Sequence, residues 1–145
     1  MFNIKKCGVH IKSKDIYKSF DFYSSLGFKP VFSYGTAEFY SRIIELDSIQ
    51  TVEEKYNGVV FDVSGMIFEI ADGHIAVKDG VFKTEMKNSK ISLIVDVDAV
   101  NEVVRITKKK KYKISVPVKV YPWGSKEVVI KDPDGVVIVF RELLD

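Results

Sequence analysis

The stretch KEVVIKDPDGVVIVFREL, residues 126–143, is the part of the chain from which the fold can be predicted outward. Two runs rich in Val and Ile, which favour β-strands, flank Asp132-Pro133-Asp134-Gly135. Pro fixes the backbone torsion that a turn needs at its second position, and Asp and Gly tolerate the conformations that close it. The stretch is therefore predicted to be a β-hairpin.

The residues just before this hairpin predict three further elements. KISLIVDV, residues 90–97, alternates as a strand does, with Ile91, Leu93 and Val95 on one face. Asp98 is expected to cap a helix that carries apolar residues at helical spacing. ISVPVKVYP, residues 114–122, is predicted to be an extended strand. This half of the chain thus reads strand, helix, strand, strand, strand.

The first half of the chain repeats this order of elements with different letters. KKCGVHIKS, residues 5–13, predicts a strand; Asp15 can cap the following helix, and Gly27 can end it. FKPVFSY, residues 28–34, is another strand, and residues 57–73 predict a hairpin that turns at Ser64-Gly65. The repeat predicts an α+β protein of two βαβββ modules, about residues 4–71 and 90–142, joined by a polar connection at 72–89.

One segment breaks the symmetry between the halves. Residues 36–56 lengthen the first half, carry several apolar and aromatic side chains, and then turn acidic. A structureless loop of this length is uncommon, so at least one helical stretch is expected here. Two interpretations stay open: a lid over a site, or a surface helix without a functional role.

Composition bounds the class of protein. The 145 residues are 46% apolar and 29% charged, which is ordinary for a globular domain, and the net charge of +2 argues neither for nor against a charged partner. The single cysteine, Cys7, excludes an intrachain disulfide, and no apolar run suggests a signal peptide or membrane span. A cytoplasmic protein is expected. The basic run at 108–113 ends a predicted helix, where cations complement the helix dipole, so nucleic-acid binding is not favoured.

Four stretches carry a resemblance to a known family: SKDIYKSFDFYSSLGF at 13–28, GMIFEI at 65–70, ISLIVDVDAV at 91–100 and PWGSKEVVIKDPDGVVIVF at 122–140. Together they resemble the vicinal oxygen chelate superfamily of glyoxalases, extradiol dioxygenases and bleomycin-resistance proteins, with the bleomycin-resistance-like members most similar. The resemblance implies a single domain over residues 4–142 whose two modules pair to form a cup. It also implies a homodimer, with modules paired within one chain or swapped between two.

The metal-dependent members of this family bind a metal through four cup-facing side chains, and the resemblance implies where these would fall. The positions carry Gly8, Glu69, Lys90 and Val139, so that only Glu69 can act as a ligand. His10 lies two residues from Gly8 on the same strand face, and a shift of register could bring it into the set. Two ligands are too few for a catalytic site, so no metal and no other cofactor is expected.

The cup face implied by the resemblance holds His10, Glu69, Lys90, Ser92 and Arg141, and PWG places Tyr121 and Trp123 at the rim. These seven residues are the predicted ligand-binding set, with no catalytic residue among them. Glu69 is expected to pair with Lys90 or Arg141, or else to reach water. Trp123 is expected either to stack on a planar ligand, in a wall with Tyr121 and Phe39 or Tyr40, or to be ordinary packing. His74 is interpreted as an exposed surface residue.

Several functions remain open at this stage. The first is a metal-free binding protein that sequesters an antibiotic or another planar ligand, with a small molecule as partner and neither nucleic acid nor membrane. The alternative is a divalent-metal-dependent lyase or isomerase of the glyoxalase type. A metal-free enzyme with Glu69 as general base and a structural or regulatory module are further possibilities. Whether the protein is an enzyme stays open.

Overall fold

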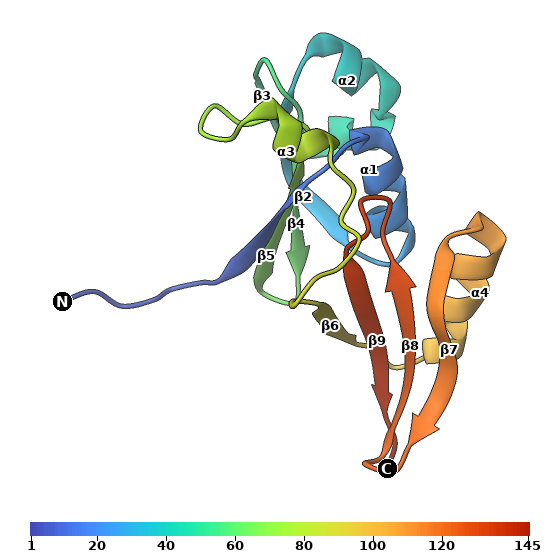
Figure 1. The fold of residues 1–145 in the computed structure, drawn as a ribbon. Helices are drawn as coiled ribbons and strands as arrows, with labels where there is room; N and C mark the ends of the chain where they lie inside the picture. Colours follow the sequence, from blue (N-terminus) through green and yellow to red (C-terminus); the bar gives the residue numbers. More distant parts are fainter. The chain divides into compact units, whose positions relative to one another are not determined.

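The computed structural model describes all residues from 1 to 145 and divides them into two compact units, Met1–Thr84 and Glu85–Asp145. Each unit contains one mixed β-sheet and one long helix (Figure 1). The predicted α+β class is confirmed. No helix combines the length and the apolar character needed to span a membrane.

The first unit carries a five-stranded sheet in the order β1-β5-β4-β2-β3. Strand β1 runs parallel to β5, β5 and β4 form a hairpin, and β4 pairs antiparallel with β2. The elements of this unit are β1 (Gly8–Lys12), α1 (Ile16–Ser25), β2 (Lys29–Gly35), α2 (Ala37–Arg42), η1 (Ile44–Ser48), β3 (Gln50–Glu53), β4 (Gly58–Val63), β5 (Met66–Ala71) and α3 (Asp79–Lys83).

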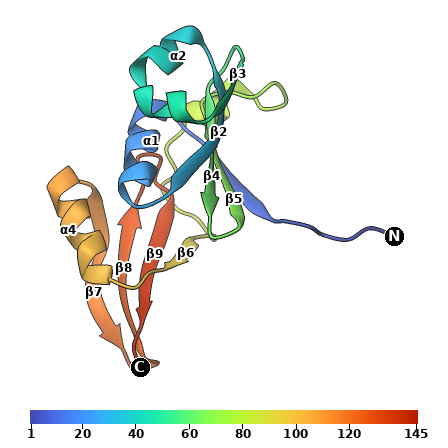
Figure 2. The same cartoon turned by 180° about the vertical axis from the view of Figure 1, so that it is seen from behind.

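The second unit carries a four-stranded sheet in the order β6-β9-β8-β7, which repeats the connectivity of the first unit without β3 (Figure 2). Its first strand again runs parallel to its last, and the other pairs are antiparallel. The elements are β6 (Leu93–Asp96), α4 (Val100–Lys110), β7 (Lys113–Tyr121), β8 (Ser125–Lys131) and β9 (Val137–Leu143). The predicted repeat of element order is therefore present.

An aromatic cluster forms the core of the first unit. Tyr23 of α1 is fully buried and its ring centroid lies 4.6 Å from that of Phe68 on β5. Phe28 and Phe61 pack around the same pair. As predicted, Asp15 caps the helix, since its carboxylate accepts from the backbone N–H groups of the first turn. Burial of these rings fixes which face of the sheet α1 covers, and the opposite face remains open.

Helix α4 begins differently from the prediction. The residue before its first turn is Ala99, and Asp98 makes no capping hydrogen bond to the helix. Oε1 of Glu142, at the end of β9, accepts from the backbone N–H of Val100 at 2.8 Å. A carboxylate from a distant strand thus satisfies an N–H group that the adjacent Asp98 was expected to satisfy. The prediction for Asp98 was wrong because local sequence does not show which side chains tertiary packing brings to a helix end.

Both predicted hairpin turns are present. Ser64 and Gly65 have φ of 51° and 89°, which suits the two-residue turn between β4 and β5. In the second turn, Asp132 accepts from the backbone N–H groups of Asp134 and Val136. Gly135 has φ of 86°, and a Cβ there would overlap the carbonyl oxygen of Met86. Only glycine allows the segment around residue 86 to approach this turn so closely.

The asymmetric segment at 36–56 forms regular secondary structure. It forms α2 and the short η1, and then adds β3 to the edge of the sheet, parallel to β2. The backbone N–H of Glu54 donates to the carbonyl of Gly35, and the hydroxyl of Tyr40 donates to that of Val52. The predicted helical stretch is confirmed. Strand β3 was not predicted, because its four residues are all exposed and show no apolar alternation.

The start of the second module also differs from the prediction. Strand β6 begins at Leu93, so that Lys90 and Ser92 precede it and are exposed. The hydroxyl of Ser89 donates a hydrogen bond to the backbone carbonyl of Ile91 and accepts one from its backbone N–H. These local bonds turn the chain just before the strand. The predicted strand at 90–97 was therefore three residues too long at its N-terminal end and one residue too long at its C-terminal end.

Candidate functional site

The open face of the first sheet presents two adjacent rows of side chains. Residues paired across neighbouring strands point to the same face, so the register aligns five positions in each row. The first row is His10, Glu69, Val60, Phe32 and Gln50, and the second is Lys12, Ala71, Gly58, Tyr34 and Val52. This face thus combines a carboxylate, an imidazole and two aromatic rings.

Tyr34 reaches across a strand to contact Glu69. It stands on β2, and its hydroxyl donates to Oε2 of Glu69 on β5 at 2.5 Å. Strand β4 lies between them, and there the chain has Gly58, whose Cβ, if present, would overlap the Tyr34 ring. The absence of a side chain at Gly58 is therefore the reason that Tyr34 can cross β4.

His10 is the second neighbour of Glu69. Its Nε2 lies 3.2 Å from Oε2 of Glu69, yet it lacks the alignment of a hydrogen bond and is buried without any other partner. Burial lowers the pKa of His10, and Lys12 and His74 act in the same direction, while Glu69 opposes them. His10 is thus mainly neutral at neutral pH. No lysine or arginine forms an ion pair with Glu69.

The phenol of Tyr34 is held in its protonated form. Burial raises the pKa of Tyr34 far above its ordinary value, and the hydrogen bond to Glu69 adds to the effect. Tyr34 can therefore only donate to Glu69 at any physiological pH. Both contacts of Glu69 go to Oε2, and Oε1 accepts no hydrogen bond from the protein.

A pocket of about 310 Å³ opens beside this cluster, within the first unit. Its lining is aromatic and acidic and includes neither lysine nor arginine: Phe32, Tyr34, Val52, Glu54, Tyr56, Glu69 and His74. The rings of Tyr34 and Tyr56 are nearly perpendicular, at 86°, with centroids 5.9 Å apart. The volume lies at the small end of the range typical of ligand pockets.

Of these seven lining residues, sequence reasoning placed only Glu69 in a site, and Phe32, Tyr34 and Tyr56 are among those that it missed. Phe32 and Tyr34 lie two residues apart on one strand, and this alternation was the signal that could have placed both on the open face. Tyr56 lies beyond β3, in the segment whose structure was left open. Phe39, expected at a rim, is fully buried under α1, where its ring packs against Tyr17, and so it lines no pocket.

The predicted site residues fall into two groups. His10 and Glu69 lie together in the first unit, with His74 exposed but 6.0 Å from His10 by ring centroids. In the second unit, the guanidinium of Arg141 makes two hydrogen bonds to Asp96, at 2.7 and 3.0 Å, which engage it locally. Glu69, for its part, contacts His10 and Tyr34. The predicted alternatives for Glu69 were Lys90, Arg141 or water; Arg141 binds Asp96 instead, and no ion pair joins Glu69 to a lysine or arginine.

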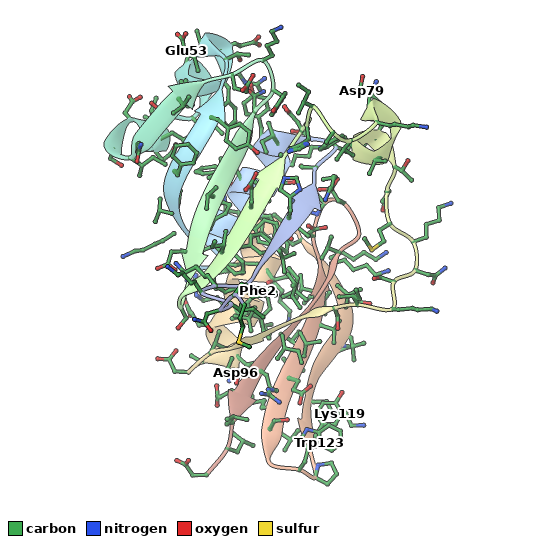
Figure 3. All side chains as sticks on the ribbon, turned by 90° about the vertical axis from the view of Figure 1, so that its left-hand side faces the viewer. Phe2, Glu53, Asp79, Asp96, Lys119 and Trp123 are labelled. Atoms are coloured by element: carbon green, nitrogen blue, oxygen red, sulfur yellow. The ribbon has the colours of Figure 1, made fainter.

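Tyr121 and Trp123 form a pair at the tip of the β7–β8 hairpin. Their rings stack with centroids 4.5 Å apart and 15° between planes, and Lys119 lies over the Tyr121 ring. Figure 3 labels Lys119 and Trp123 together at this end of the second unit. Trp123 is 67% exposed, and its Nε1 donates to Glu127. Its ring is therefore free to contact a further molecule, as a rim residue would be.

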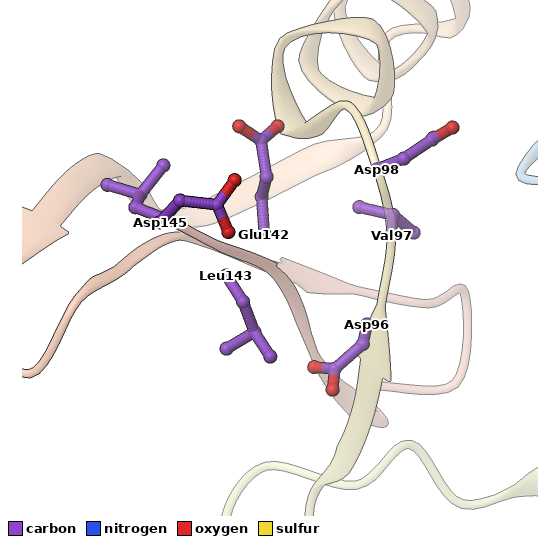
Figure 4. A pocket seen from close by; sticks show the side chains of 7 residues that line it. Asp96, Val97, Asp98, Glu142, Leu143 and Asp145 are labelled. Carbon is purple, nitrogen blue, oxygen red and sulfur yellow. The ribbon is translucent and has the colours of Figure 1, made fainter.

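A second pocket, of about 560 Å³, lies at the C-terminal end of the second unit. Its lining includes four acidic side chains, Asp96, Asp98, Glu142 and Asp145, drawn in Figure 4. Two of these already have structural partners, since Asp96 binds Arg141 and Glu142 caps α4. Hydrogen bonds from Arg141 hold the pKa of Asp96 below its ordinary value.

The donor set does not fit the metal that the resemblance would imply. Gly8 faces Ile67 across β1 and β5, and the residue paired with Glu69 is His10. The register therefore brings one imidazole and one carboxylate together, but no group of three or more His, Cys, Asp or Glu side chains converges as a metal site. A catalytic transition metal needs at least three protein ligands.

The fold and the family model lead to the same class of protein. Each βαβββ unit has an open sheet in which the first strand pairs with the last strand of the unit, and two such units define a glyoxalase-type fold. The model of the Glyoxalase/Bleomycin resistance protein/Dioxygenase superfamily matches residues 9–140. The chain belongs to this superfamily, as its sequence resemblance implied.

Solved structures share the fold at low sequence identity. TioX from Micromonospora sp. ML1 is 16% identical with a TM-score of 0.63, covering 97% of this chain and 100% of that one. A member of the same superfamily from Sphaerobacter thermophilus is 19% identical, with a TM-score of 0.60 and coverage of 97% and 98%. A mutant of the fosfomycin resistance protein FosX from Listeria monocytogenes, complexed with Mn(II) and a dihydroxypropylphosphonic acid, is 13% identical, with a TM-score of 0.61 and coverage of 97% and 91%. A comparison with curated protein sequences gives no match.

Proposed function

We propose that this protein binds a small organic molecule without a metal and sequesters it. The observation that carries the proposal is the pocket on the open face of the first sheet, where Tyr34 holds Glu69 and aromatic rings form the walls. Pockets of this kind, mostly aromatic with a few fixed polar groups, are typical of ligand sites. The predicted residues Lys90, Ser92, Tyr121, Trp123 and Arg141 belong to the second unit, where Tyr121 and Trp123 are proposed as a separate stacking surface for a ligand.

One structural relative is a metal-containing resistance protein, and the present chain differs from it in the residues available as ligands. FosX is named as a fosfomycin resistance protein, and its structure contains Mn(II) with a phosphonic acid. At or beside the positions implied by the resemblance, the present chain has His10 and Glu69 as possible ligands on the first module, and Lys90 and Val139 on the second. A binding role that needs no metal therefore fits these residues better than a metal-dependent lyase or isomerase activity.

A thermal-shift screen tests the proposal. A ligand that binds only the folded state raises the melting temperature, so planar organic molecules and divalent metals are added separately. Stabilisation by organic molecules that is lost in Tyr56→Leu is the expected result. Stabilisation by a divalent metal alone, with close to one metal per chain by elemental analysis, would favour the metal-dependent alternative.

One observation supports a second candidate, a metal-free enzyme. Glu69 is flanked by a protonated phenol and a neutral imidazole, which are groups able to hold and transfer protons. Mass spectrometry of a bound ligand after long incubation separates the two functions. A sequestering protein returns the ligand unchanged, whereas an enzyme changes it, and Glu69→Gln abolishes that change.

We also propose that the chain forms a homodimer. Support comes from an apolar row on the face of the second sheet opposite α4: Ile94, Val139, Val129 and Val116. Ile94 is 63% exposed and no helix of its own unit covers this row. Exposed apolar rows of this kind favour association. Light scattering at micromolar concentration should give twice the mass of the chain, and a monomer would contradict the proposal.

A further inference from the structure

We propose that the pocket of the first unit selects an organic ammonium cation, held against the perpendicular rings of Tyr34 and Tyr56 and neutralised by Glu69 and Glu54. This inference rests on the proposed binding function and names the chemical class of its ligand. It follows from three features of the pocket: its charge, the orientation of its rings and the state of the groups beside Glu69.

The charge of the pocket is negative. Glu54 and Glu69 line it, and neither forms an ion pair with a lysine or arginine. The nearest cations point elsewhere or lie outside the lining: the Lys12 ammonium donates to the backbone carbonyl of His10, and Lys55 lies next to Glu54 in the neighbouring pockets. A half-buried carboxylate without a cationic partner is costly, and a bound cation would offset that cost.

The rings are arranged as walls. Tyr34 and Tyr56 are nearly perpendicular, Phe32 lies 6.3 Å from Tyr34, and His74 lies 6.1 Å from Tyr56, all by ring centroids. An ammonium group within about 6 Å of several ring faces is attracted by their quadrupoles, and this attraction is strongest where water is excluded. A neutral ligand of the same shape gains the apolar contact but not the electrostatic attraction to the rings.

The groups beside Glu69 leave its charge available. Tyr34 donates a hydrogen bond as a neutral phenol, and neutral His10 adds no positive charge. Both contact Oε2, so that Oε1 remains open to a ligand. The same features disfavour an anion such as a phosphonate, because no positive side chain of the pocket could receive it.

A pair of probes that differ only in charge tests the inference. Choline and 3,3-dimethylbutan-1-ol have the same shape, with a quaternary nitrogen replaced by carbon. Titration of the whole protein, followed by NMR, should give a dissociation constant for choline at least tenfold lower than for the alcohol. Glu69→Gln should remove most of this ratio, and Tyr56→Leu should weaken choline more than the alcohol. Asp98→Asn, in the acidic pocket of the second unit, is the matched control and should leave both constants unchanged.

Each other outcome has a defined meaning. Equal affinity for the two probes, with shifts at Tyr34 and Tyr56, overturns the cation preference while the proposed binding function stands. Loss of choline binding in Asp98→Asn but not in Glu69→Gln also overturns it, because the cation then binds the second unit. If neither probe binds and no organic molecule raises the melting temperature in the screen above, the proposed function itself fails.

Discussion

The ring of Tyr34 occupies the space that a side chain at Gly58 would fill. Because Gly58 has no side chain, Tyr34 on β2 can cross β4 and donate a hydrogen bond to Glu69 on β5. Gly58 is itself buried in strand β4, where glycine normally weakens pairing. Its presence there has a specific physical reason, since the hydroxyl of Tyr34 could not otherwise contact a carboxylate two strands away.

Replacing Gly58 by Ala should therefore displace Tyr34 and break its hydrogen bond to Glu69. Overpacking of this kind typically costs about 1–3 kcal/mol of the free energy of unfolding. Chemical denaturation measures the loss, and NMR of the tyrosine rings reports the displacement. Gly80→Ala is a matched control, because a Cβ at Gly80 meets nothing within 4 Å. Equal stability of the two variants would contradict the crossing geometry.

The second prediction concerns the pH dependence of stability. Because the pKa of His10 is lower in the folded state than its ordinary 6.5, the unfolded chain binds a proton first as pH falls. The contribution of neutral His10 to the free energy of unfolding is complete above pH 6.5 and is lost as the pH falls toward the folded-state pKa of His10. The free energy of unfolding should thus decrease over this window, before the carboxylates titrate.

Substitution identifies the group responsible. His10→Gln should flatten the decrease just below pH 6.5, measured by urea denaturation at a series of pH values. The charged and titratable groups that face His10 are Glu69 on β5, Lys12 on its own strand and His74 in the following loop. His74→Gln is the control and should retain most of the dependence. A flat wild-type profile would contradict the assignment.

A third prediction separates the two candidate caps of helix α4. Glu142→Ala removes the acceptor of the Val100 N–H and should cost about 1 kcal/mol of the free energy of unfolding. Asp98→Ala should change it by no more than about 0.5 kcal/mol, because Asp98 is exposed and makes no capping bond. Thermal and urea denaturation of the two variants compare them directly. A larger loss of stability in Asp98→Ala than in Glu142→Ala would show that Asp98 caps the helix, as predicted from the sequence.

The fourth prediction addresses Trp123. Because its side chain is two-thirds exposed at a hairpin tip, Trp123→Ala should lower the free energy of unfolding by only about 0.5 kcal/mol. A ligand that stacks on the rim should lose affinity in this variant, whereas Trp123→Phe should keep part of it. Calorimetric titration and thermal denaturation give the two quantities. A variant that binds normally but melts much earlier would make Trp123 a packing residue.

The class of fold could be predicted because its signals are local. Alternation of apolar residues in β-strands, the cap at Asp15, and the turns at Ser64-Gly65 and Asp132–Gly135 each act over a few residues. Their repetition in one order was enough to indicate two βαβββ modules and, with the quoted motifs, the superfamily. Strand β3 escaped prediction because parallel pairing at a sheet edge leaves no apolar period in four exposed residues.

The sequence by itself determined the order of the elements, the two modules, and Glu69 and His10 as residues of interest, because these depend on short-range patterns. Only the tertiary structure decided what Glu69 contacts, since that depends on strand register: β1 pairs with β5 so that His10 meets Glu69, and Gly58 lets Tyr34 reach it from β2. It likewise assigned Arg141 to Asp96 and Glu142 to the start of α4. The members of these pairs are separated by 35 to 59 residues of chain, and no local pattern encodes which of them will face one another.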